Sequence, residues 1–308
     1  VSLENTLNYI TNPEKNRELY QLIWQPLEPY LEGIKKINIS PSGLLNQVAF
    51  DALNTDKKGE NLLLNKYEIS YYGNLRDFIS EREETPTSET IVTVGGAYYE
   101  LDSTQLAAIA QKKFNSKETF AFEETETEFN FRSAVSDSTR TGVRFNYLAG
   151  TKKEAENIHR EFTEKGWKSN LITGQNALEG QIKSLSGNQA PDILHIATHG
   201  YFFNKNKQNK TEGRTLRERI MNAENPLLRS GLVFSGVNYT WLGGQPIEGL
   251  EDGVLTAYEI SNLDLFNTKL AVLSACETGR GDVHDAEGVF GLQRAFKTAG
   301  VDQLIISL

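Results

Sequence analysis

Cysteine is almost absent from this chain of 308 residues, in which Cys276 is the only one. A single thiol cannot form an internal disulfide, which excludes a disulfide-stapled secreted scaffold and fits a reducing compartment. No apolar run approaches the roughly 20 residues of a membrane-spanning helix, and the N-terminus lacks a basic segment followed by an apolar one. We therefore expect a cytoplasmic protein that has no membrane partner.

Positive charge is also scarce, since 32 Lys and Arg residues face 41 Asp and Glu residues and give a net charge of -9. This balance argues against a surface that neutralises phosphates, so we expect no direct nucleic-acid partner. Hydrophobic residues at 38% and charged residues at 24% are typical of an ordinary globular protein. The length is sufficient for two packed domains.

Strand and helix patterns alternate regularly in the second half of the chain. Strands are predicted at residues 145–149, 169–173, 193–198, 232–235, 270–275 and 304–307, with helices beginning near residues 151 and 176 and a later one through residues 289–296. Thr151 and Glu154 have the spacing of a helix-capping box. The first half is less regular and carries acidic stretches at residues 80–90 and 123–128. We place a domain boundary near Gly142, which gives regions 1–141 and 142–308.

His199 and Cys276 each follow a predicted buried strand. Catalytic groups in parallel sheets gather beyond the carboxyl ends of the strands, so both side chains are expected at one crevice. An imidazole can take the proton of a thiol, and the thiolate can then attack a carbonyl. The backbone N–H groups of Gly200 and Cys276 are candidate donors to the resulting oxyanion. Taken alone, this spacing also fits an inert buried cysteine and a hydrogen-bonded histidine.

Other polar residues give weaker signals. His195 faces the same side of its strand as His199, and we expect it to pack or to support the site rather than to react. A zinc site of Cys276, His199 and His195 lacks the usual ligand spacings, so no metal or organic cofactor is predicted. The acidic residues Glu251, Asp252 and Asp282 are candidate substrate-binding residues for a basic side chain, or equally solvent-facing loop acids.

Several longer motifs resemble the CHAT domain. They are His-Ile-Ala-Thr-His-Gly at 195–200, Asn-Pro-Leu-Leu-Arg-Ser-Gly-Leu-Val-Phe-Ser-Gly at 225–236, Glu-Asp-Gly-Val-Leu-Thr-Ala-Tyr-Glu-Ile at 251–260, Leu-Ser-Ala-Cys-Glu-Thr-Gly at 273–279 and Glu-Gly-Val-Phe-Gly-Leu-Gln-Arg-Ala-Phe at 287–296. An early segment at 39–50 is similar as well. CHAT domains resemble caspases, separases and gingipains, so the resemblance implies an α/β fold with a caspase-like, mostly parallel sheet flanked by helices. It further implies a degenerate caspase-like half at 1–141 and a catalytic half at 142–308.

The same resemblance implies a cysteine endopeptidase that acts on a protein substrate through a thioester, with Cys276 and His199 as its dyad. Family members commonly follow helical repeats, so an upstream sensor region or an activating protein is expected, in bacterial defence or signalling. The family pattern usually continues past Leu308, and we expect the catalytic region to be cut short there. The alternatives are a non-catalytic caspase-like interaction scaffold and a thiol transferase or ligase.

Overall fold

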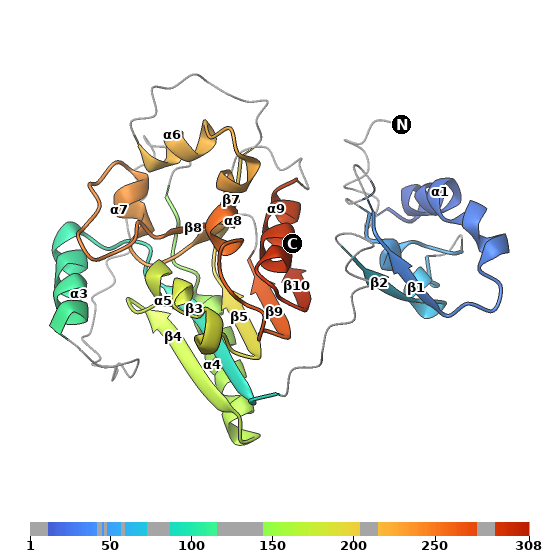
Figure 1. The fold of residues 1–308 in the computed structure, drawn as a ribbon. Helices are drawn as coiled ribbons and strands as arrows, with labels where there is room; N and C mark the ends of the chain where they lie inside the picture. Colours follow the sequence, from blue (N-terminus) through green and yellow to red (C-terminus); the bar gives the residue numbers. More distant parts are fainter. Residues whose placement is uncertain are drawn as a thin grey trace. The chain divides into compact units, whose positions relative to one another are not determined.

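The computed structural model of the chain describes residues 12–41, 45, 48–56, 59–72, 87–115, 144–203, 215–275 and 287–307. It divides into two compact units (Figure 1). Unit 1 comprises Val1–Glu84 with Asp282–Ala286, and unit 2 comprises Thr85–Gly281 with Glu287–Leu308. The division therefore lies at residue 84 and not near Gly142, where we expected it.

Unit 1 is built around a small parallel sheet of β1 (Lys36–Ile39) and β2 (Glu68–Tyr71). Its helices are α1 (Pro13–Ile23) and the 3-10 turns η2 (Gln25–Tyr30), η4 (Phe50–Ala52) and η5 (Leu63–Asn65). The rings of Trp24, Phe50 and Tyr67 pack together in its core. Because β1 and β2 run parallel, a hairpin turn does not join them.

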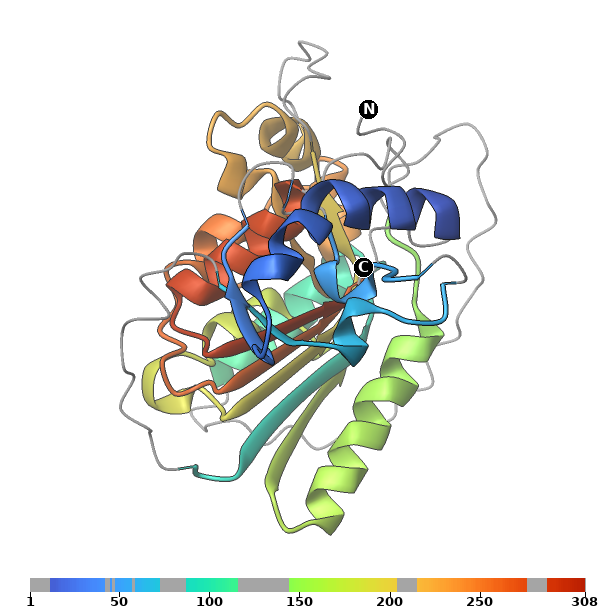
Figure 2. The ribbon, with the colours of Figure 1, turned by 90° about the vertical axis from the view of Figure 1, so that its right-hand side faces the viewer.

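A parallel sheet of five described strands forms the centre of unit 2, in the order β10-β9-β5-β3-β4 (Figures 1 and 2). The strands are β3 (Thr90–Ala97), β4 (Lys168–Gly174), β5 (Ile193–Ala197), β9 (Leu270–Ser274) and β10 (Gln303–Ser307). Four of them were predicted from the sequence, but β3 was missed. Because β3 pairs with both β4 and β5, the sheet that carries the predicted catalytic half begins well before Gly142.

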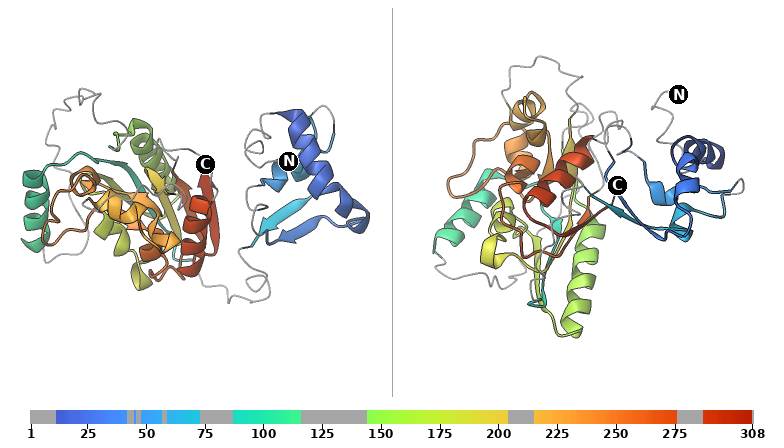
Figure 3. Two further views of the ribbon diagram at one scale, coloured as in Figure 1. Left: turned by 90° about the horizontal axis from the view of Figure 1, so that it is seen from above. Right: turned by 45° about the vertical axis from the view of Figure 1, so that its right-hand side comes forward.

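Helices cover both faces of this sheet (Figure 3). The helices of unit 2 are α3 (Ser103–Asn115), α4 (Ala149–Glu164), α5 (Glu179–Lys183), α6 (Leu216–Met221), α7 (Val237–Trp241), α8 (Ala257–Ile260) and α9 (Glu287–Thr298), with 3-10 turns η6 (Gly187–Gln189) and η8 (Pro226–Leu228). Helix α4 lies along one face, and α5, α8 and α9 lie on the other. This layered arrangement confirms the expected fold class of a mostly parallel α/β sheet flanked by helices.

A second, antiparallel sheet follows the carboxyl edge of β5. It has the order β6-β7-β8, formed by β6 (Gly200–Phe202), β7 (Ser230–Val233) and β8 (Val254–Thr256). The chain enters it directly from β5, with only Thr198 and His199 between the two sheets. The residue that the sequence singled out as a base therefore lies at the junction of the two sheets.

The start of α4 differs from the prediction in two ways. Residues 145–149 are not a strand, because Asn238 holds the backbone of Phe145 in place of a neighbouring strand: its Oδ1 accepts from the Phe145 N–H at 2.9 Å, and its Nδ2 donates to the Phe145 carbonyl at 2.9 Å. The predicted capping box is also wrong. Helix α4 begins at Ala149, and the Thr151 hydroxyl accepts from the Gly96 N–H at 3.0 Å.

Candidate active site

The two strands that precede the predicted dyad are neighbours in the central sheet. Ala197 of β5 pairs with Ser274 of β9, and the Thr198 N–H donates to the Ser274 carbonyl at 3.3 Å. Both strands run in the same direction, so the chain leaves them at the same edge of the sheet. This geometry brings Ala197 and Ser274, which are 77 residues apart in the chain, to the same edge of the sheet.

His199 is held in a closely packed position just beyond β5. Its side chain is 3% exposed, and its ring lies 4.9 Å from the Tyr99 ring and 5.6 Å from the Phe145 ring, measured between centroids. Its Nε2 is 2.7 Å from the carbonyl oxygen of Asn146. A carbonyl only accepts, so Nε2 carries the hydrogen and donates it to Asn146, which leaves Nδ1 as the basic nitrogen.

Burial lowers the pKa of His199 below its ordinary value of 6.5, because the charged imidazolium loses solvation, while the hydrogen bond to Asn146 acts in the opposite direction. The ring is therefore neutral at neutral pH, which is the form that can accept a proton. Sequence analysis missed Asn146, since the segment that contains it was predicted to be a strand. The carbonyl that orients His199 is a backbone group, for which the residue type gives no signal.

Gly200 is placed so that its backbone N–H is directed away from β7. The Val233 N–H donates to the His199 carbonyl at 3.0 Å, which makes Gly200 and Leu232 a non-hydrogen-bonded pair of the antiparallel ladder. A Cβ atom built on Gly200 would lie 3.9 Å from the Cβ of Ala275. The residue immediately before Cys276 is thus next to the residue immediately after His199.

Cys276 and Asp282 lie outside the described residues, so the contact between the thiol and the imidazole remains a prediction. Ala275 is the last described residue before the predicted nucleophile. Of the predicted oxyanion donors, only Gly200 is described. The structure places His199 and Gly200 beside the end of β9, where the sequence predicted that the site would form.

His195 occupies a buried position on β5, as expected, with 4% exposure. Its Nε2 lies 3.0 Å from Oε1 of Glu154 on α4, and the Ser274 hydroxyl donates to the other oxygen, Oε2, at 3.2 Å. Glu154 is another residue that sequence analysis missed as part of the site, because its spacing from Thr151 was assigned to a helix cap. Its carboxylate connects the two strands that lead to the predicted dyad.

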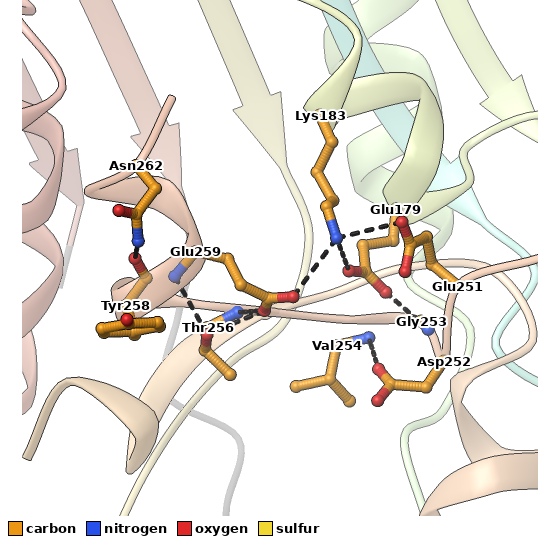
Figure 4. Close-up of polar contacts among 10 residues, drawn as sticks. All are labelled: Glu179, Lys183, Glu251, Asp252, Gly253, Val254, Thr256, Tyr258, Glu259 and Asn262. Atoms are coloured by element: carbon orange, nitrogen blue, oxygen red, sulfur yellow. Dashed lines mark hydrogen bonds and ion pairs between the residues drawn. The ribbon is translucent and has the colours of Figure 1, made fainter. Parts of the chain in front are cut away.

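The acidic residues Glu251 and Asp252 lie in a different polar cluster, centred on Lys183 (Figure 4). Lys183 Nζ lies 3.0 Å from Glu251 Oε1, 3.4 Å from Glu179 Oε1 and 3.3 Å from Glu259 Oε1. Oδ1 of Asp252 accepts from the Val254 N–H at 2.9 Å. Glu251 already pairs with Lys183, so a basic substrate group at Glu251 would compete with this lysine.

Glu179 is the most deeply buried carboxyl of this cluster, with 2% exposure. Burial, assisted by the negative charges of Asp252 and Glu259, raises the pKa of Glu179 from 4.5 to about 8, although Lys183 acts against the shift. Burial likewise raises the pKa of Asp252. Oε2 of Glu179 accepts from the Gly253 N–H at 2.9 Å, which fixes the loop before β8.

A small pocket adjoins this cluster and is lined by Glu179, Glu251 and Asp252 together with apolar side chains such as Leu106. It is also lined by Ser235, whose hydroxyl donates to the carbonyl of Gly174 at the end of β4. The pocket therefore lies beyond the carboxyl edge of the same sheet as His199. Substrate clefts of open α/β sheets form at this edge.

Neither a metal centre nor a membrane span is found in the part of the chain that the structure describes. Within the described residues, no group of three or more His, Cys, Asp or Glu side chains is arranged to hold a metal ion. Among the described helices, none is both long and apolar enough to cross a membrane.

Comparison with known families identifies one match that covers nearly the whole chain. Residues 13–308 match the family model described as CHAT domain. Comparison with curated proteins gives no match. CHAT domains are related to caspase-like peptidases. The family match thus agrees with the motifs at 195–200 and 273–279 and with the parallel sheet that joins them.

Proposed function

Because the chain belongs to the CHAT domain family, we propose that it is a cysteine endopeptidase in which Cys276 attacks a peptide carbonyl and His199 moves the proton. One observation carries this proposal: Ala275, which is bonded to Cys276, lies beside Gly200, with 3.9 Å between its Cβ and the Cβ position of the glycine. Consecutive Cα atoms are about 3.8 Å apart, so the nucleophile follows within one residue of that contact.

The tautomer of His199 assigns the proton-transfer steps to its Nδ1, since the Nε2–H is engaged by Asn146. Nδ1 takes the proton of the Cys276 thiol, and the thiolate adds to the carbonyl carbon of the scissile bond. The N–H groups of Gly200 and Cys276 donate to the oxyanion. The imidazolium then protonates the leaving amine, the C–N bond breaks, and a water activated by the same nitrogen hydrolyses the thioester.

Activation by an upstream sensor region or a partner protein is part of this proposal. His199 is 3% exposed and its ring packs against those of Tyr99 and Phe145, so the resting chain shields its base from solvent. A protease that must stay inactive until it receives a signal benefits from such shielding. The single thiol also fits a reducing cytoplasm, in which Cys276 stays reduced and can act as a nucleophile.

Alkylation of the thiol provides a direct test, because Cys276 is the only cysteine and intact mass therefore reports on it alone. We expect iodoacetamide to alkylate the wild-type chain about tenfold faster at pH 7 than a His199→Ala variant, since an adjacent base raises the thiolate fraction. His159→Ala is the matched control, because that ring hydrogen bonds with Ser169 at 2.7 Å, at the start of β4 and therefore at the opposite edge of the sheet, and should not affect the rate.

Cleavage of a proteome-derived peptide library, with Cys276→Ala as the control, tests the reaction itself and reveals the preferred P1 residue. Identical library profiles for the wild type and Cys276→Ala, tested with the upstream region or activator present, would leave only the non-catalytic scaffold. Products joined to an added amine instead of water would identify a transferase or ligase. Each result separates one of these functions from the others.

A further inference from the structure

One carboxylate connects three elements around the proposed dyad. Glu154 extends from α4 with Oε1 at 3.0 Å from His195 Nε2 on β5, and its Oε2 accepts from the Ser274 hydroxyl on β9 at 3.2 Å. These contacts link residues that are 41 and 120 positions apart in the chain. The carboxylate is 37% exposed, whereas the His195 ring that it contacts is 5% exposed.

The protonation of His195 is determined by its surroundings. Its Nδ1 is buried and has no hydrogen-bond partner among the described residues, so a proton on that nitrogen would be left unsatisfied. Burial lowers the pKa of His195, and the neighbouring Glu154 opposes this without reversing it. The ring is therefore neutral, and its Nε2–H donates to Glu154. A buried ring with one satisfied nitrogen depends on that hydrogen bond for its orientation.

The positions of the two donors relate Glu154 to the reaction. His195 precedes His199 by four residues, and Ser274 precedes Cys276 by two. The strands pair here with His195 opposite Val272 and with Ala197 opposite Ser274. Glu154 therefore contacts each strand at a position no more than four residues before the residue that is proposed to react.

We propose that Glu154 is a positioning residue, whose carboxylate holds the ends of β5 and β9 in the arrangement that brings the His199 imidazole and the Cys276 thiol together. This inference rests on the proposed peptidase function. A helix-capping role does not account for Glu154, since the hydroxyl of Thr151 donates to the Leu148 carbonyl and accepts from the Gly96 N–H instead. The carboxylate of Glu154 hydrogen bonds with side chains of two strands of the sheet and does not cap helix α4.

Hydrogen-bond chemistry predicts how substitutions of Glu154 rank. A carboxylate accepts from both donors at once. In a Glu154→Gln variant the amide oxygen can accept from His195, and the amide NH₂ can donate to the Ser274 hydroxyl, so the geometry is kept although the charge is lost. A Glu154→Ala variant loses both contacts. Position and charge can therefore be separated experimentally.

The experiment measures the alkylation rate of Cys276 by iodoacetamide against pH in the full chain, together with kcat and KM for a substrate found by library cleavage. For Glu154→Ala we expect alkylation at pH 7 to fall toward the rate of His199→Ala. We also expect kcat to drop by roughly 10- to 100-fold with KM within about twofold, because small misplacements of reacting groups affect the chemical step. Glu154→Gln should restore both to within about threefold of the wild type.

Two further variants keep the test decisive if Glu154→Ala is poorly folded. Ser274→Ala removes only one of the two contacts, and we expect an intermediate loss in kcat. Glu161→Ala, an exposed position on the same helix, is the control and should behave as the wild type.

A wild-type alkylation profile and kcat in Glu154→Ala, or a Glu154→Gln variant as impaired as Glu154→Ala, would overturn the positioning role. If His199→Ala itself leaves alkylation and cleavage unchanged, the proposed function fails, and that result is distinct from a failure confined to Glu154. A loss that appears in KM alone would indicate a substrate contact and would also refute the inference.

Discussion

The buried carboxyl of Glu179 should make the free energy of unfolding decrease as the pH rises, because its pKa is raised in the folded chain. In the folded chain its pKa is raised from 4.5 to about 8, so between these values the folded state holds a proton that the unfolded chain has released. Stability from this group is fully present below pH 4.5 and is lost as the pH rises toward 8. The limiting slope is about 1.4 kcal/mol per pH unit.

We expect this loss to disappear in a Glu179→Gln variant. The amide oxygen can accept from the Gly253 N–H, as Oε2 of Glu179 does at 2.9 Å, while the amide NH₂ replaces Oε1, which accepts from Lys183 Nζ at 3.4 Å. Loss of that contact lowers stability by an amount that does not vary with pH, and the side chain stays uncharged at every pH, as the protonated carboxyl is. Between pH 6 and pH 8 the wild type should lose about 2 kcal/mol relative to Glu179→Gln.

Urea unfolding followed by tryptophan fluorescence measures this difference. A Trp24→Phe background removes the signal of unit 1, so that Trp167 and Trp241 report on unit 2. Glu248→Gln, an exposed acid in the loop before β8, controls for the change in net charge and should give a difference from the wild type that does not vary with pH. Parallel stability curves for the wild type and Glu179→Gln from pH 6 to pH 9 would refute the reasoning.

Two other substitutions test the packing around the site. Gly200→Ala should fold with a melting temperature close to that of the wild type, because the added methyl meets only ordinary contacts, at 3.6 Å from the Gly231 carbonyl and 3.9 Å from Ala275. It should nevertheless reduce peptide cleavage by about tenfold or more, since the methyl occupies space beside the proposed oxyanion donor; unchanged cleavage would remove Gly200 from the site. Arg229 is 3% exposed, and its Nε and Nη1 have no hydrogen-bond partner among the described residues. Arg229→Met should therefore be neutral or stabilising by about 1 kcal/mol in urea unfolding, and a loss above about 2 kcal/mol would show that the guanidinium has an anionic partner.

Strand β3 was missed because the prediction of strands relied on local composition. Residues 90–97 are apolar enough for a central strand, and seven of the eight are buried. They follow the acidic stretch at residues 80–90 and include Gly95 and Gly96, which weaken a strand pattern, and no strand was predicted there. Gly95 is required because a Cβ there would lie 2.2 Å from the Thr151 carbonyl of α4. Close packing of helix on strand explains this glycine, and packing is not visible in a local pattern.

The sequence by itself determined the alternation of buried strands and helices, the parallel sheet, and the placement of His199 just beyond one of its strands. These features follow from hydrophobic periodicity and chain direction, which neighbouring residues encode. The tertiary structure alone decided the partners of the polar groups. In the fold, His199 hydrogen bonds with the carbonyl of Asn146, and Glu251 pairs with Lys183. Glu154 contacts residues of two strands and does not cap its own helix. A hydrogen bond or ion pair depends on distances of a few ångströms between groups far apart in the chain, and only the packed fold sets those distances.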